Sequence, residues 1–108
     1  MRIFCICIIF LLTHTQCKQE SPLPIPPSQL IEVLADIHLA EAAAQSLPLK
    51  TKDTTLTMYY KQVFEIHDVS QQDFDSTMVI LKSKPKWLKA VYEKVIETID
   101  QRKATVGR

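Results

Sequence analysis

The apolar residues in the last quarter of the chain recur at the spacing of an α-helix. Between residues 85 and 102, one half of a helical wheel is apolar and the other half is charged. The apolar half consists of Trp87, Leu88, Val91, Tyr92, Val95, Ile96 and Ile99. Pro85 suits the first turn of such a helix, because its missing N–H would have no intrahelical partner there. Gly107 is the only glycine of the chain, which disfavours a β-fold built from tight hairpins.

Three further stretches show helical spacing, over about residues 28–46, 55–67 and 70–82. Ser28 is an N-cap candidate for the first, and Ser70 with Asp73 resembles a capping box at the third. We expect Asp68 to take the backbone conformation that glycine often adopts after a helix. The sequence therefore predicts an all-α fold, a small bundle of four helices, with residues 47–54 as a polar loop.

The N-terminus has the features of a signal peptide. Arg2 is followed by an apolar run of about ten residues and a polar exit before Cys17. The run is too short to span a membrane, which takes about 20 apolar residues. Cys5 and Cys7 lie in this leader, so Cys17 is the single cysteine left after cleavage, and lipidation accounts for it. We predict a lipoprotein signal peptide over residues 1–16; the alternative is an ordinary signal peptide cleaved near Thr15.

A proline-rich stretch separates Cys17 from the first helix. Four of the seven residues 21–27 are prolines, a composition typical of extended polyproline II. We expect residues 17–27 to form a lipidated tether, with a ligand for a partner's groove as the alternative. The organisation predicted for the rest is a helical domain over residues 28–102 and a frayed tail over residues 103–108.

Charge and composition exclude several classes of function. Removal of a leader that contains Arg2 leaves equal numbers of basic and acidic side chains, so nucleic acid is not an expected partner. The chain has no glycine-rich phosphate loop and few potential metal ligands. We therefore expect no enzymatic activity, no cofactor and no metal site.

Glu41 is the most unusual residue of the predicted helices. On the wheel it falls between Leu30 and Leu34, within the apolar face, so its carboxylate should be partly desolvated and in need of a partner. The candidate partners are His38, Tyr59 and Tyr60. We interpret this group as a structural polar clasp between the first two helices; a pair of metal ligands or a general acid is the alternative.

Some apolar residues lie outside the main core stripe of their helices. They are Ile31, Ala35, Leu39 and Ala42 in the first helix and Val79 and Ile80 in the third. We expect part of this surface, represented by Ile31, Leu39, Val79 and Ile80, to stay exposed and to bind a partner. Tighter wrapping of the helices around one another is the alternative.

Three stretches together resemble a known family. They are residues 34–42, 60–74 and 84–95, with the sequences LADIHLAEA, YKQVFEIHDVSQQDF and KPKWLKAVYEKV. They are similar to small Gram-negative lipoproteins of the Bacteroidota type that are known only as a domain of unknown function, of the DUF4296 kind. That family usually has a glycine near Asp68 and aromatic residues near Ile80, and both are missing here. The resemblance implies a helical lipoprotein at the outer membrane and brings no assigned activity.

Taken together, these features favour a non-enzymatic accessory lipoprotein of the cell envelope, most naturally at the outer membrane. It would be anchored through lipid at Cys17 and would bind another envelope protein. The alternative is a small ligand-binding or hydrolytic module that uses His38 and Glu41 in a pocket between helices. An enclosed pocket holding both residues would favour this alternative, and a flat apolar patch would favour the partner hypothesis.

Overall fold

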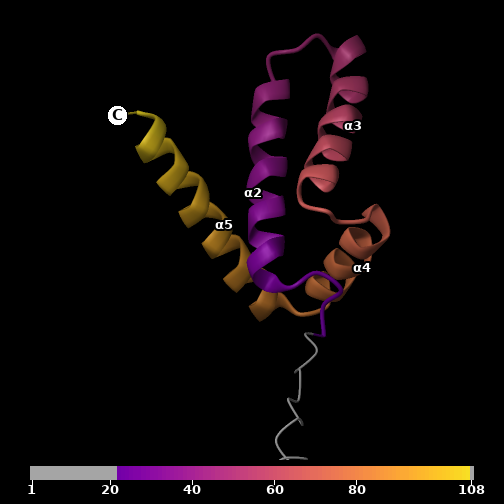
Figure 1. Ribbon diagram of the computed structural model, residues 1–108, viewed down its shortest axis with the longest axis vertical. Coiled ribbons are helices and arrows are strands. Elements are labelled where there is room, and N and C mark those ends of the chain that lie inside the picture. Colours follow the sequence, from indigo (N-terminus) through magenta and orange to yellow (C-terminus); the bar gives the residue numbers. More distant parts are fainter. Residues whose placement is uncertain (1–21, 108) are drawn as a thin grey trace, which may run out of the picture.

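The computed structural model describes residues 22–107, and these form four α-helices and no strand. The helices are α2 (Pro27–Ala44), α3 (Leu49–Ile66), α4 (Gln71–Lys82) and α5 (Pro85–Val106) (Figure 1). The all-α prediction is confirmed. The predicted signal peptide and Cys17 lie outside the described residues.

The central element is α2, which packs against both α3 and α5, while α4 packs against α5. Figure 1 shows α2 and α3 as an antiparallel pair and α5 running obliquely to α2. The wide apolar surface of α2 explains its position, because it supplies residues to both apolar clusters of the core. The larger cluster contains Leu23, Ile25, Leu30, Leu34, Ala35, Leu81, Val91 and Val95. The smaller contains Val33, Ile37 and Val63.

The start of α3 differs from the prediction. The helix begins at Leu49, within the expected polar loop, rather than near Thr55. Pro48 precedes it, and the Pro48 carbonyl accepts hydrogen bonds from the amides of Thr51 and Lys52. The first turns are largely solvent-exposed and carry no apolar stripe, so periodicity gives no sign of them.

The end of α3 is as predicted, with Asp68 in the left-handed conformation at φ 52°. The Val69 amide donates to the Phe64 carbonyl at 2.9 Å, and the Asp68 amide donates to the Glu65 carbonyl at 3.2 Å. This pair of hydrogen bonds is a Schellman motif. Val69 then packs against the smaller core cluster, which turns the chain back toward α4.

The proline-rich stretch requires a correction, because its second half is part of the core rather than a free spacer. Leu23 and Ile25 are 5% and 2% exposed, whereas the flanking prolines are exposed. The chain bends through residues 22–25, and both aliphatic side chains face inward together. The buried Ile25 amide donates to Thr77 Oγ1 of α4 at 3.2 Å. The domain therefore includes residues 22–26.

The last helix also extends further than expected. It continues through Arg102 to Val106, whereas the sequence predicts a frayed tail from residue 103. Arg102 contacts α2, as described below, and this contact holds the helix in place beyond its apolar stripe. Among residues 22–107, no helix is long and apolar enough to cross a membrane.

Candidate functional site

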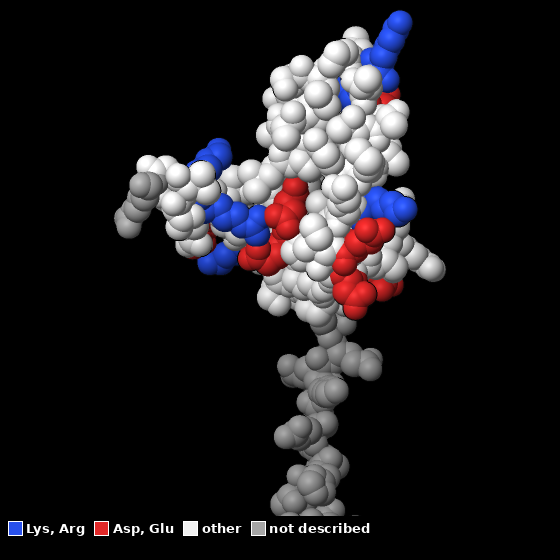
Figure 2. Space-filling model, turned by 45° about the horizontal axis from the view of Figure 1, so that its top comes forward, with Lys and Arg blue, Asp and Glu red and all other residues white. Residues whose placement is uncertain are grey.

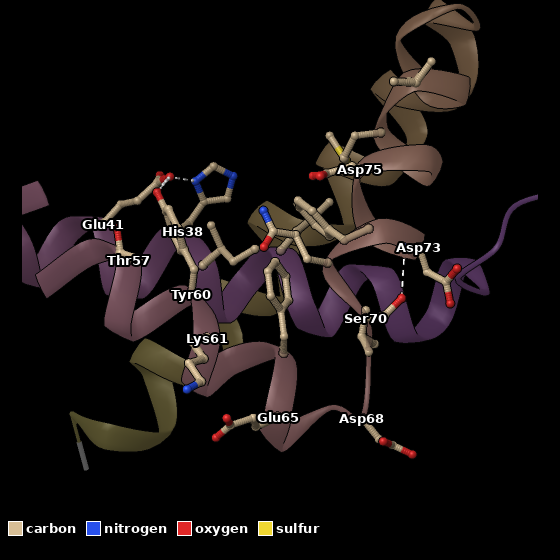
Figure 3. Close-up of a pocket in the computed structure, with 18 of the residues that line it drawn as sticks. His38, Glu41, Thr57, Tyr60, Lys61, Glu65, Asp68, Ser70, Asp73 and Asp75 are labelled. Carbon is tan, nitrogen blue, oxygen red and sulfur yellow. Dashed lines mark hydrogen bonds and ion pairs between the residues drawn. The ribbon is translucent and has the colours of Figure 1, made fainter. Parts of the chain in front are cut away.

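Residues of α2, α3 and α4, together with Tyr92 of α5, line an open groove of about 1330 Å³ (Figure 3). Its floor is apolar and includes Leu34 and Ile37 of α2, Phe64 of α3, and Phe74 and Met78 of α4. The rings of Phe64 and Phe74 lie 5.1 Å apart between centroids and join the two walls at one end. α3 packs along α2, whereas α4 packs against α5, and the groove lies between these two pairs of helices.

Acidic side chains border the apolar floor near the turn between α3 and α4. We call this group the acidic rim; it consists of Glu65, Asp68, Asp73 and Asp75. All four side chains are exposed, and among residues 22–107 none of them forms an ion pair. The predicted cap at Ser70 brings Asp73 to this position, because Ser70 Oγ accepts a hydrogen bond from the Asp73 amide at 3.0 Å.

The other end of the groove holds three of the four residues proposed as a polar clasp. Tyr60 Oη donates to Glu41 Oε1 at 2.8 Å, and His38 Nδ1 lies 3.3 Å from Glu41 Oε2 (Figure 3). Tyr59 does not line the groove. Burial, followed by the hydrogen bond and charge of Glu41, raises the pKa of the Tyr60 hydroxyl above its ordinary value. The contact therefore links α2 to α3 through a neutral phenol and a carboxylate.

Glu41 is less buried than its place on the wheel indicates. Its side chain is 42% exposed, and that of His38 is 38% exposed. A wheel gives the angle of a residue around the helix but not what covers that angle, and here the face of α2 opens into the groove. The carboxylate is partnered, as expected, but it is not within the core.

The four residues of the predicted partner surface divide into two pairs. Ile31 and Ile80 pack against the larger core cluster. Leu39 and Val79 are 36% and 69% exposed. Val79 lines the groove, so one residue of the predicted surface belongs to the site that the structure forms.

A second polar cluster, which the sequence analysis does not anticipate, lies where α5 meets α2. Asp36 Oδ2 is 2.5 Å from His67 Nε2, and Asp36 Oδ1 accepts from Arg102 Nη1 at 2.5 Å. Arg102 also pairs with Glu32. In Figure 2, acidic and basic side chains meet between the arm formed by α5 and the body of the molecule. In the sequence, the only sign of this cluster is that Glu32 and Asp36 lie at i and i+4 on one helix, a spacing at which both carboxylates can bind the same cationic side chain.

Electrostatics favours this second cluster as a structural connection. Burial, the largest single effect, lowers the pKa of Arg102, but the carboxylates of Asp36 and Glu32 outweigh it and raise the pKa overall. Each of the four groups in this cluster thus has a partner within the domain. Within the described part of the chain, no three His, Cys, Asp or Glu side chains form a group that could hold a metal ion.

These features define a small helical domain with an open groove, an apolar floor and an acidic border. The chain belongs to the family described as domain of unknown function DUF4296, whose pattern matches residues 23–105. The match begins at Leu23, which agrees with the finding that residues 22–26 are part of the domain. No curated protein and no solved structure shows a significant match to the chain.

Proposed function

We propose that this protein is a non-enzymatic lipoprotein of the cell envelope, anchored at the outer membrane through Cys17. Its helical domain would bind an apolar segment of another envelope protein in the groove between α2, α3 and α4. The observation that carries the proposal is the groove, because Phe64, Phe74 and Met78 are only partly buried in it and a partner that covers them would remove apolar surface from water.

The size of the groove favours a polypeptide over a small metabolite. Small-molecule pockets usually measure about 300–1000 Å³ and bury most of their ligand. The groove measures about 1330 Å³ and is open along one side. A side-chain row of a partner segment would fill such a shape, whereas a small metabolite would leave most of the floor in water.

The lipid anchor would strengthen binding without adding contacts. Confinement of the domain at a membrane surface raises its effective concentration toward any partner in the same membrane. A modest groove is then sufficient for a stable association. This supports an accessory role in the envelope, and it is consistent with the lone Cys17 after the apolar leader.

The alternative is a small ligand-binding or hydrolytic module. The observation in its favour is that His38 and Glu41 both line the groove. However, Glu41 already accepts from Tyr60, and both side chains are more than one-third exposed, so neither has the dry environment that acid–base catalysis uses. The groove therefore supports binding of a partner better than chemistry.

Photocrosslinking in intact cells tests the proposal. A photoreactive amino acid at Val79 would face the groove, and one at Lys89, on the exposed side of α5, would serve as the matched control. We expect irradiation to give a protein adduct of defined mass from position 79 and none from position 89. The proposal fails if neither position gives an adduct, or if both give the same one.

A further inference from the structure

We infer that the segment bound in the groove is an amphipathic helix whose basic residues lie toward one of its ends. This inference rests on the proposed function and adds the chemistry of the partner. Three observations carry it: the shape of the walls, the charge of the rim, and the unequal distribution of that charge along the groove.

The walls of the groove favour a helix as the occupant. Side chains of α2, α3 and α4, with Tyr92 of α5, line the space, so a further helix placed there would contact more than one neighbouring helix. Helices pack with axes about 8–10 Å apart by fitting side-chain ridges into grooves. An extended strand would need a sheet edge for its backbone hydrogen bonds, and residues 22–107 contain no strand.

The charge around the floor favours a basic occupant. Five carboxylates line the groove, the acidic rim and Glu41, against the two lysines Lys61 and Lys82. The rim carboxylates have no ion-pair partners among the described residues, so they attract cations that arrive on a ligand. Such complementarity selects the partner and accelerates its association more than it adds affinity.

The charge is concentrated at one end of the groove, which gives the bound helix a direction. Glu65, Asp68 and Asp73 lie around the turn where α3 meets α4 and Asp75 lies further along α4, while the opposite end contains His38, Glu41 and Tyr60 (Figure 3). There the Glu41 carboxylate is already occupied by Tyr60 and His38. Lysines or arginines of the partner should therefore lie at the rim end, and its uncharged apolar turns should lie over Phe64 and Met78.

Model peptides test the inference with the full chain held in nanodiscs of zwitterionic lipid. The first peptide is a labelled helix of about 18 residues, five turns, with leucines on one face and lysines toward one end. The second replaces lysine by glutamate, and the third has the first peptide's composition arranged with the alternation of a strand. Fluorescence anisotropy measures each affinity, with empty nanodiscs as the blank.

We expect the lysine helix to bind best and to weaken as salt is added. The glutamate helix should bind about tenfold or more weakly, because like charges would meet at the rim. Asp73→Asn with Asp75→Asn should weaken the lysine helix about fivefold, since exposed charge pairs contribute modestly. The control, Glu93→Gln with Asp100→Asn, removes the same charge from the exposed side of α5 and should change nothing.

A floor variant separates apolar binding from charge attraction alone. Val79→Ser leaves the charge of the groove unchanged and removes an exposed apolar side chain that lines it. We expect weaker binding of the lysine helix; unchanged binding would show that charge alone holds the peptide and would overturn the inference.

The outcomes distinguish this inference from the proposed function. If the glutamate or strand-pattern peptide binds as well as the lysine helix while the adduct from position 79 persists in cells, the groove binds a segment of different chemistry. The inference is then wrong and the proposed function stands. If no adduct forms in cells, the proposed function fails whatever the peptides do.

Discussion

At the residue scale, Asp68 occupies a position where glycine would fit with less strain. Its φ of 52° lies in the left-handed region, where a residue with a Cβ atom is disfavoured by about 1–2 kcal/mol. Its carboxylate also follows the C-terminus of α3, where the helix dipole disfavours negative charge. The chain keeps an acidic side chain at a position that local structure does not favour, and that side chain belongs to the acidic rim.

Asp68→Gly should therefore stabilise the domain by about 0.5–1 kcal/mol, the difference between relieved strain and the added flexibility of glycine when unfolded. Urea unfolding followed by circular dichroism measures this change. Asp68→Asn keeps the size and removes the charge, so it separates the dipole effect from the backbone effect. A loss of stability in the glycine variant would show that the carboxylate has a stabilising contact within the domain.

The contribution of Tyr60 to the stability of the folded domain is lost in alkaline solution. Because its pKa is raised in the folded state, the stability from this group is fully present below the ordinary value of 10.0 and is lost as pH rises through the raised value. Tyr60→Phe should therefore be less stable than the parent near neutral pH, and the difference should shrink in alkaline solution. Unfolding curves between pH 8 and 11 compare the two, and a constant difference across that range would contradict the assignment.

At the scale of the elements, two neighbouring residues of α4 have opposite environments. Val79 is 69% exposed in the groove, and Ile80 packs against the larger core cluster. Val79→Lys should change stability by no more than about 0.5 kcal/mol, and Ile80→Lys should cost about 1–3 kcal/mol because a charge enters an apolar contact. Thermal unfolding of both variants measures the contrast. Equal losses would mean that α4 has a different rotation about its axis.

Thr77 connects α4 to the segment before α2. It is fully buried, donates to the Asp73 carbonyl at 2.6 Å and accepts from the Ile25 amide at 3.2 Å. Thr77→Val keeps the shape but leaves that amide without an acceptor, which should destabilise the domain by about 1–3 kcal/mol. Hydrogen exchange at the Ile25 amide should accelerate. Thr77→Ser keeps the hydroxyl and should preserve the protection of that amide, whereas loss of protection there would contradict the role of the hydroxyl.

The sequence predicts helical turns that carry an apolar stripe or a cap better than helical turns that carry neither. The helix of α5 and the cap of Ser70 follow from local patterns, and both appear in the structure, although Trp87 and Ile96 of the α5 stripe are 41% and 59% exposed. The exposed first turns of α3 contain no stripe and are missed. For residues 22–26, the proline content predicts an extended spacer, whereas the chain bends through residues 22–25 and buries two side chains; the alternation of Leu23 and Ile25 with proline was the sign that one side would be buried.

The site is predictable only in part, because it depends on how three helices meet. Wheel positions bring together His38, Glu41 and Tyr60, which lie on facing sides of α2 and α3. No local pattern places Asp73 of α4 on the same groove as Glu65 of α3, since this depends on the turn at Asp68. The pairing of Asp36 with Arg102 is equally inaccessible, because 66 residues separate the two.

At the scale of the whole molecule, the proposed anchor makes a direct prediction. If Cys17 carries the lipid, mass spectrometry of the mature N-terminus should show a diacylated or triacylated cysteine. Cys17→Ser should move the protein from the membrane fraction to the soluble fraction or leave it unprocessed. A mature N-terminus at any other residue would contradict the anchor.

The burial of Leu23 and Ile25 has a geometric consequence for a protein anchored in this way. The chain from Cys17 to Leu23 can span at most about 20 Å when fully extended, so the linker between the proposed anchor and the domain would be short. The linker joins the domain beside α4, at the end opposite the turn between α2 and α3 (Figure 1). That turn would point away from the bilayer, and the acidic rim would lie nearer the lipid headgroups. The groove would then have a fixed distance from the membrane and a fixed orientation. Binding of a partner in the same membrane would therefore cost less rotational freedom of the domain.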